Sequence, residues 1–534
     1  MNQILLFIGL VIILCLTIKP VGKKLPFPTL LIFIALGMLL GVNGPAHIDF
    51  NDYALTETVC STALLFIMFY GGFNTNIDRA KPVAAPAVLL STLGVVITAG
   101  ITGAFAHLVL GFDWIGGLLL GSVVASTDAA SVFSVLRERN LSLRDGTNSL
   151  LEVESGSNDP VAYMLAAVLA TLAAGGNIDI PMLLAKQIIL GVGLGLAIGW
   201  ASSRLIERAH ATAEGAQTIF LFAVAIEAYA LPSYLGGNGF LAVYLAGIVL
   251  GASDITGKVE MAHFFDTLTE MAEMTIFFLL GLLVTPARLP QMLLPGLALM
   301  AFMLFVSRPI AVGALLAPFK TTPPRQVALI SWAGLRGAAS VVFSLFAVMA
   351  GVPGGHDLFD LVFVIAVSSI VVQGSLLPAV AKKLDMIDAA RGVRRTFNDY
   401  RDEDGMSFVK LKVGAGHPFA GRSLADIGSA TDMLVVLALR DGAHPVLPNG
   451  DTVIEEGDLL VMAAQTFEER AEVTLREVTV TTHGRLAVQR LRDVPQGKHP
   501  FIVVMLKRGD QTIIPDGNTL IYAGDEAVIA TLAS

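Results

Sequence analysis

The stretch Glu154-Ser155-Gly156-Ser157-Asn158-Asp159-Pro160 sets two carboxylates inside an otherwise apolar part of the chain, and residues 161–174 that follow carry no charge. A charged side chain in a bilayer is costly, so it persists mostly where it works or is paired. A second anomaly is the base of the apolar stretch Gly334-Leu335-Arg336-Gly337. Acids and a base buried in one membrane protein indicate ion translocation.

The composition places most of the chain in lipid. Of the 534 residues, 54% are hydrophobic and only 15% are charged, with a mean hydropathy of +0.71. A soluble domain has about a quarter of its residues charged. The net charge of −9 gives no sign of a nucleic-acid partner. We expect Cys15 and Cys60, which lie in apolar runs, to be packing residues.

Apolar runs of about 20 residues are expected for each membrane crossing. The sequence predicts a polytopic α-helical membrane protein of about 13 transmembrane helices. The division between the eighth and ninth is the least distinct. The predicted spans are about 3–19, 27–42, 57–73, 84–110, 114–135, 149–175, 181–206, 217–234, 239–252, 267–285, 290–317, 325–350 and 358–381.

The charges of the loops predict the orientation. With the first loop placed in the cytoplasm, the inside loops hold fifteen Lys and Arg residues, whereas the outside loops and their edges hold only Lys186 and Arg288. Basic residues favour the cytoplasmic side. We therefore expect a multi-pass protein of the inner (plasma) membrane, with its N-terminus outside and its C-terminus in the cytoplasm.

The composition changes after Lys383. We expect a transmembrane domain over residues 1–383, a linker over 384–404, and a soluble α+β domain over 405–534. The soluble part contains two copies of one module at a constant offset of 67, without a gap: 434–442 matches 501–509 and Pro448-Asn449-Gly450 matches Pro515-Asp516-Gly517. The groove between the two copies is a plausible effector site.

Spacing along the sixth span predicts a cation site. Ser155 and Asp159 are four positions apart, so they share one helix face and together offer oxygens to a monovalent cation. Asn158 can contribute or orient, and Pro160 frees a backbone carbonyl. The alternative is a polar knot that only ties helices together.

Two further spans are interrupted by small and polar residues. One interruption is Ala125-Ser126-Thr127-Asp128-Ala129-Ala130-Ser131, and the other is 334–337. Freed carbonyls and helix ends at such breaks coordinate cations in transporters. If spans 4–6 and 11–13 are inverted repeats, the two breaks fall in the middle helix of each triplet.

Arg336 needs a partner in lipid, because an unpaired buried charge is far costlier than a paired one. Glu154 is the favoured partner, and this pairing would leave Asp159 free to titrate. Asp128 is the rival partner. Glu227 is another acid within a span, for which the sequence predicts no role.

These residues carry a family resemblance. Ser126-Thr127-Asp128, the 154–160 stretch and Gly334-Leu335-Arg336-Gly337-Ala338 resemble those of bacterial NhaP-type members of the monovalent cation–proton antiporter-1 family, over residues 1–383. The tail is similar to the TrkA-C (RCK-C) module of potassium-transport regulators. The combination is similar to a potassium/proton antiporter subgroup.

The resemblance implies a homodimer whose core of broken helices moves against a dimerisation domain. It implies that Asp159 binds the cation and the proton in turn, with Ser155 and the Thr127 backbone as further ligands of the metal ion. Asn158 and Asp128 would be near neighbours, and Glu154 and Arg336 a structural ion pair. An Asn-Asp pair in place of Asp-Asp implies electroneutral exchange.

The chain departs from that family at two positions. Tyr70 stands where many relatives have an acid before the Gly-Gly of the third span, and Ala129 follows Asp128 where relatives often have proline. The first departure removes one candidate ligand or gate contact. It therefore bears on which ion is preferred.

We predict a cation/proton antiporter, with potassium favoured over sodium, controlled by the tail. A cyclic dinucleotide or another nucleotide is the predicted effector, and no cofactor is expected. A sodium/proton antiporter with the same core is one alternative. A ligand-gated cation channel is another, although no Thr-Val-Gly-Tyr-Gly filter is present. An enzyme is not expected, because no nucleophile–base pair or metal cluster is recognisable.

Overall fold

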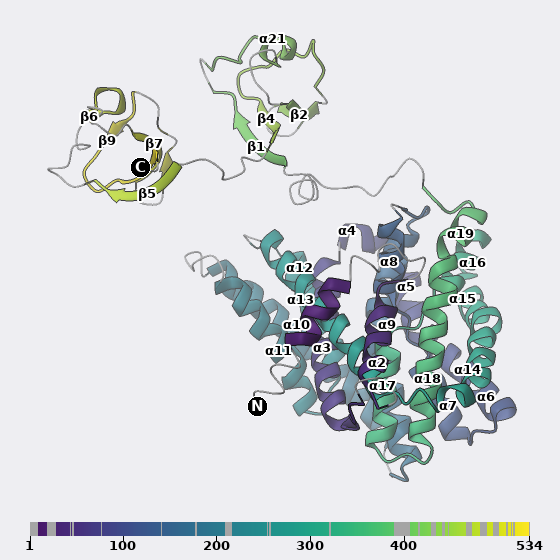
Figure 1. The fold of residues 1–534 in the computed structure, drawn as a ribbon. Helices are drawn as coiled ribbons and strands as arrows, with labels where there is room; N and C mark the ends of the chain where they lie inside the picture. The colour runs from purple at the N-terminus through teal and green to yellow at the C-terminus, as the bar shows by residue number, and fades with distance from the viewer. Residues whose placement is uncertain are drawn as a thin grey trace. The chain divides into compact units, whose positions relative to one another are not determined.

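The computed structural model divides the chain into two compact units, Met1–Val393 and Arg394–Ser534, which we describe separately (Figure 1). The described residues are 9–18, 28–42, 44, 47–75, 77–139, 141–176, 179–208, 216–253, 255, 258–319, 322–388, 406–414, 417–428, 434–440, 444–446, 448–465, 473–480, 489–494, 501–508, 511–513, 515 and 518–532. Most of the predicted linker, 389–404, and residues 3–8 and 19–27 therefore lie outside the described part.

The first unit is built from helices throughout its described part. A short helix, Gly9–Ile18, comes first. The others are α2 (Leu30–Leu40), α3 (Tyr53–Asn74), α4 (Ile77–Ala80), α5 (Ala84–Leu89), α6 (Val95–Leu110), α7 (Trp114–Val123), α8 (Ala129–Glu138), α9 (Thr147–Ala173), α10 (Ile180–Arg208), α11 (Ala216–Tyr234), α12 (Gly239–Ala252), α13 (Lys258–Leu283), α14 (Leu289–Phe302), α15 (Arg308–Leu316), α16 (Pro324–Trp332), α17 (Ala338–Met349), α18 (Gly355–Ser369) and α19 (Ser375–Lys383).

Six helical stretches of the described residues are long and apolar enough to cross a bilayer. Several shorter apolar helices accompany them, among them α2, α7, α12 and α17. The six stretches are Tyr53–Asn74, Lys81–Leu110, Ile180–Ile206, Ala216–Tyr234, Leu289–Leu316 and Gly355–Lys383. The unit is therefore a polytopic helical membrane domain, as the composition predicts.

Two chain segments are interrupted near their middle, as the small and polar residues predict. The first break, residues 124–128, separates α7 from α8, and the second break, residues 333–337, separates α16 from α17. Three other long helices stay continuous but contain π-helical turns, at Leu90–Gly94 (η2), Met303–Ser307 (η3) and Ile370–Gly374 (η4). Such turns are frequent at functional sites.

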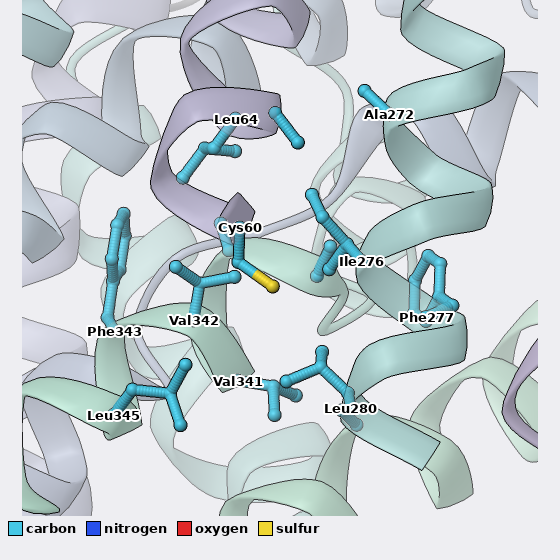
Figure 2. Packing of buried hydrophobic residues seen from close by; sticks show 14 of the residues in the cluster. Cys60, Leu64, Ala272, Ile276, Phe277, Leu280, Val341, Val342, Phe343 and Leu345 are labelled. Atoms are coloured by element: carbon cyan, nitrogen blue, oxygen red, sulfur yellow. The ribbon is translucent and has the colours of Figure 1, made fainter. Parts of the chain in front are cut away.

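An apolar core packs around α3, α13 and α17, which Figure 2 shows from close by. Cys60 and Leu64 from α3 lie near Ile276 from α13 and Val342 from α17, and all four are buried. Both cysteines of the chain are free and buried in this cluster, as their apolar surroundings predict. The packing thus joins helices from the beginning, the middle and the end of the membrane unit.

The tail unit contains two four-stranded sheets of the same topology. One has the order β1-β4-β2-β3 and the other β5-β10-β7-β8. The strands are β1 (Met406–Lys412), β2 (Leu434–Arg440), β3 (His444–Val446), β4 (Leu459–Gln465), β5 (Val473–Thr479), β7 (Phe501–Arg508), β8 (Gln511–Ile513) and β10 (Glu526–Leu532), with a short helix α21 (Leu424–Gly428) in the first copy and a separate pair β6 (Gln489–Arg490) and β9 (Leu520–Ile521) in the second.

One part of the sequence match between the two copies is wrong by a single position. Strands β1, β3 and β4 precede β5, β8 and β10 by the expected offset of 67, but β2 and β7 are related by an offset of 68. The ladders place Val435 opposite Met462 and Val503 opposite Ile529. The connection from β7 to β8 is shorter by one position than that from β2 to β3, so the gap is compensated and the total length is unchanged.

The corrected register gives both copies the same ion pair. Arg440 bonds to the buried Asp458 at 3.3 Å, and Arg508 bonds to the buried Asp525 at 2.8 Å. Each aspartate also accepts a backbone N–H, from Glu455 or from Tyr522. We call this arrangement, an arginine paired with a buried aspartate that also accepts a backbone N–H, the arginine–aspartate clamp, and both modules contain it.

Candidate cation-binding site

The helix α9 carries most of the predicted site. It continues through Pro160, which has no N–H to donate to the carbonyl of Gly156. Asp159 is 7% exposed, and Asn158 is 1% exposed. An ionisable group this deep in a membrane domain is costly without partners, so its neighbours determine what it can do.

The first break supplies those neighbours. The Ser126 hydroxyl donates to Oδ1 of Asp159. The Ser155 hydroxyl donates to the Thr127 carbonyl at 2.7 Å, and the Asn158 amide donates to the Thr127 hydroxyl at 2.5 Å. The structure thus brings together four of the predicted ligands. It also places the hydroxyl of Ser126 against Asp159. Ser126 lies in the predicted interruption, but it was not predicted to be a ligand.

The cluster is rich in oxygen atoms that suit a hard monovalent cation. A carboxylate, a freed backbone carbonyl and three hydroxyls lie on two facing segments. Oδ1 of Asn158 is buried and has no hydrogen-bond partner among the residues that the structure describes. Buried acceptors are nearly always paired, so an unpaired one beside a carboxylate favours an ion at this place.

Asp128 lies where the two breaks cross. Its carboxylate accepts the N–H of Ser131 at 3.1 Å and the Ser131 hydroxyl at 2.5 Å, which caps the start of α8. Its own N–H donates to the Leu335 carbonyl at 2.9 Å. A Cβ atom at Gly337 would overlap with Oδ2 of Asp128, so this crossing needs glycine there.

Arg336 closes the end of α7. Its side chain donates to the carbonyls of Ala125 at 2.8 Å and Ser126 at 2.7 Å, and it is 3% exposed. Its backbone N–H donates to the Ser369 hydroxyl at 3.0 Å. The carbonyls at a helix C-terminus carry partial negative charge, which a guanidinium complements. Arg336 from the second break therefore holds the first break in place.

The predicted ion pair of Glu154 with Arg336 is wrong in its partner. Glu154 forms its salt bridge with Arg308, and the side chains are 1% and 3% exposed. Arg308 begins α15, directly after the π-helical turn η3. Arg308 was not predicted as a site residue, although a charge within the apolar span 290–317 is the same signal that singled out Arg336. Helix neighbours are set by tertiary packing, which a span list does not contain.

The fold and the site define a class of protein. Two interrupted helices that cross beside a buried carboxylate are the arrangement of ion-coupled secondary transporters. Residues 9–383 match the family described as sodium/hydrogen exchanger, transmembrane, and the chain belongs to this family. Residues 408–466 and 475–534 each match the TrkA-C domain, one match for each sheet of the tail.

Known proteins resemble the chain over most of its length. The K(+)/H(+) antiporter NhaP2 of Shewanella sp. (strain MR-4) is 36% identical, covering 87% of this chain and 81% of that protein. The K(+)/H(+) antiporter NhaP of Alkalimonas amylolytica is 38% identical over 72% of this chain and 67% of its own. The Na(+)/H(+) antiporter ApNhaP of Aphanothece halophytica is 26% identical over 71% and 73%.

A solved structure shares the fold of the membrane unit. It is that of the sodium proton antiporter MjNhaP1 from Methanocaldococcus jannaschii, with a TM-score of 0.62 and 22% sequence identity. The match covers 72% of this chain and 99% of the chain in that structure.

Proposed function

We propose that this protein exchanges one monovalent cation for one proton across the inner membrane by alternating access. Potassium is favoured, because the relatives that are 36% and 38% identical are named K(+)/H(+) antiporters. Sodium is the alternative, because one relative at 26% identity is named a Na(+)/H(+) antiporter. Asp159 is the carboxylate that holds either ion. Ser155, Thr127, Asn158 and Ser126 complete the cation site, with Asp128 beside it.

The observation that carries the proposal is the balance of charge around the crossing. Among the described residues there, Glu154 pairs with Arg308 and Arg336 contacts backbone carbonyls, whereas the Asp159 carboxylate contacts the Ser126 hydroxyl and is the group that we assign to the exchanged ions. One bound proton and one bound monovalent cation each neutralise the Asp159 carboxylate, so the two loaded forms carry the same formal charge. A charged core is costly to move through lipid. The two loaded forms are therefore the ones that cross.

The same balance supports electroneutral exchange. One carboxylate, Asp159, serves both ions, and the two loaded forms carry the same charge. An imposed membrane potential is then expected neither to drive net exchange without ion gradients nor to change its rate. Potential-driven uptake in vesicles would mean that Asp128 carries a second proton.

We further propose thirteen crossings in two inverted repeats. The supporting observation is that a π-helical turn precedes each break in corresponding helices, η2 before the first and η3 before the second. The N-terminus would lie outside and the C-terminus in the cytoplasm, because of the distribution of basic loop residues. A homodimer is part of the same proposal. It would be tested by cross-linking and mass measurement in membranes.

The tail is proposed to regulate the membrane domain of residues 1–383. The matches to the TrkA-C domain support a ligand-binding role for residues 405–534, with 384–404 as the linker. A nucleotide, for example a cyclic dinucleotide, is the candidate ligand. A ligand controls the transporter only through different affinities for two states of the tail. Exchange measured across pH, with and without nucleotides, tests this role.

The central experiment is ion exchange in proteoliposomes. A pH-sensitive dye inside the vesicles reports proton movement when potassium, sodium or choline is added outside. We expect potassium to give exchange at lower concentration than sodium, and choline to give none. An equal response to all three would remove the transport proposal, whereas a preference for sodium would change only the cargo.

A further inference from the structure

Three segments of the membrane unit meet where its last helix ends. Residues 384–388 follow α19 and are the last described before the tail. Residues 141–146 lead directly into α9. Pro324 begins α16, which leads into the second break. Two of these segments thus lead into helices next to the site, α9 and α16. The third segment, 384–388, leads into the tail.

Backbone hydrogen bonds join the end of α19 to the start of α9. Leu143 and Ile387 form an isolated antiparallel bridge. The N–H of Arg144 donates to the Met386 carbonyl at 2.9 Å, and the N–H of Asp388 donates to the Ser142 carbonyl at 2.9 Å. Leu143 and Met386 are buried at 4% and 0% exposure within one apolar cluster. The two segments therefore pair as short strands do, and their side chains Leu143 and Met386 anchor the pair in the apolar cluster.

Charged side chains extend this contact to α16. Oδ2 of Asp385 lies 2.8 Å from Nη1 of Arg144 and 3.4 Å from Nη1 of Arg325. Arg325 also reaches Asp145 at 3.4 Å, and Gln326 donates to the Asp145 carbonyl at 3.0 Å. The Asp385 side chain is 71% exposed. Exposed pairs of this kind are individually weak, so their geometry is adjustable.

We propose that this clasp, made by residues 142–145, 325–326 and 385–388, is the point through which the tail controls transport, and that Asp385 is its positioning residue. The inference rests on the proposed function. Because the clasp ties the tail's origin to the starts of both α9 and α16, a displacement of 385–388 moves both helices. Asp159 is the thirteenth residue of α9, on the same rigid rod.

Full-length variants test the clasp. Asp385→Asn removes the charge that both arginines contact, and Asn tolerates the left-handed backbone at this position, where φ is 53°. Asp385→Glu keeps the charge and serves as the rescue. Asp357→Asn is the matched control, because Asp357 is also an exposed carboxylate paired with an arginine, Arg288. A ten-residue Gly-Ser insertion after Asp388 loosens the tail while it leaves the clasp intact.

The readout is the pH profile of potassium/proton exchange in proteoliposomes. We expect Asp385→Asn and the insertion to shift the pH of half-maximal rate in the same direction by about half a unit or more, and their combination to add little. Asp385→Glu and Asp357→Asn should keep the wild-type profile. A merely structural role would lower the rate of Asp385→Asn without moving its profile.

Three results would overturn the clasp. They are an unshifted Asp385→Asn profile beside a shifted insertion, an unshifted profile in both, or shifts that add fully. Failure of the proposed function is separate, because it would show as an absence of ion-dependent exchange in the unaltered protein.

Discussion

The two breaks of the membrane unit have the same form and opposite chemistry. The first break presents the Ser126 hydroxyl and the Thr127 carbonyl to the polar face of α9. The second break presents the Arg336 side chain to the first, and the backbone N–H of Arg336 donates to the Ser369 hydroxyl at 3.0 Å. One break presents oxygen atoms, and the other presents a guanidinium group.

The difference shows how two similar breaks come to do different work. A helix C-terminus offers carbonyls with partial negative charge, which either a cation or a guanidinium can satisfy. Arg336 contacts the carbonyls of Ala125 and Ser126, whereas the next carbonyl, that of Thr127, faces Ser155 of α9. The second break thereby occupies two of the carbonyls of the first. The tail modules differ in this respect, because their two copies keep the same arginine–aspartate clamp.

The largest effect is expected from Asp159→Asn, which removes the titratable group that the first break contacts through Ser126. Exchange should fall by about two orders of magnitude or more, while folding is kept. Ion-induced dye responses in proteoliposomes and the melting temperature in detergent measure the two quantities. Glu227→Gln, an acid-to-amide change within α11, is the control and should remain active. Retained exchange in Asp159→Asn would refute the assigned role of the first break.

The second effect separates the two buried arginines. Glu154→Gln should destabilise the protein by about 3–5 kcal/mol, because it strands the guanidinium of Arg308. Adding Arg308→Gln should restore part of the stability, whereas adding Arg336→Gln should lower it further, since Arg336 holds carbonyls and not Glu154. Yield and melting temperature of the single and double variants decide this. If Arg336→Gln and not Arg308→Gln restored stability, Arg336 would be the partner of Glu154.

A third test concerns the crossing itself. Gly337→Ala places a methyl group where the Asp128 carboxylate now lies, so the two breaks must move apart. We expect exchange to fall by about tenfold or more. Gly313→Ala, where a Cβ meets nothing within 4 Å, is the matched control on the neighbouring α15. Equal activity of both variants would mean that the breaks need not fit closely.

A smaller effect is expected from Ser126→Ala. The hydroxyl is one of several oxygens at the site, so its loss should raise the potassium concentration for half-maximal exchange by about three- to tenfold and change the maximal rate less. Ser131→Ala, which removes a hydroxyl from the Asp128 cap instead, is the comparison. If the two variants gave the same change, the Ser126 contact with Asp159 would have no special part in binding.

The smallest effect concerns the tail, where the copies are expected to behave alike. The hydrogen bonds from Arg508 hold the pKa of Asp525 below its usual range. The stability from this pair is therefore complete above the ordinary aspartate pKa of about 3.9 and is lost as the pH falls through the lower folded-state pKa. Hydrogen exchange of β7 and β10 should show this acid transition, and Asp525→Asn should remove it. Asp458→Asn should lower the protection of β2 and β4 by a similar amount, and a clear difference would end the equivalence of the modules.

Much of the site was predictable because its signals are local. The spacing of Ser155 and Asp159 on one helix, and the polar interruption at Ser126-Thr127-Asp128, indicate their chemistry without knowledge of the fold. The partner of Glu154 was not predictable in this way. Which helix lies beside α9 depends on packing between distant spans, and Arg308 and Arg336 were equally available by charge.

The tail shows the same limit at a finer scale. The constant offset identified both copies, and it places three of the four strands of each sheet correctly. It fails on β7, where an extra residue in the strand is offset by a shorter turn. The alignment by residue identity makes Asp441 the equivalent of Arg508 in the other copy. The ion pairs instead make Arg440 the equivalent of Arg508. Only hydrogen-bond register decides between alignments that have the same length.

The burial of both cysteines has a practical consequence. Cys15 and Cys60 are the only thiols of the chain, and each is fully covered in the apolar core. A cysteine introduced at the surface would therefore be the sole reactive thiol, and the native pair would not have to be replaced. Labels could then be attached one at a time to the clasp, to the breaks or to the two modules. Movements of these parts could then be followed by single-site labelling of the otherwise unaltered protein.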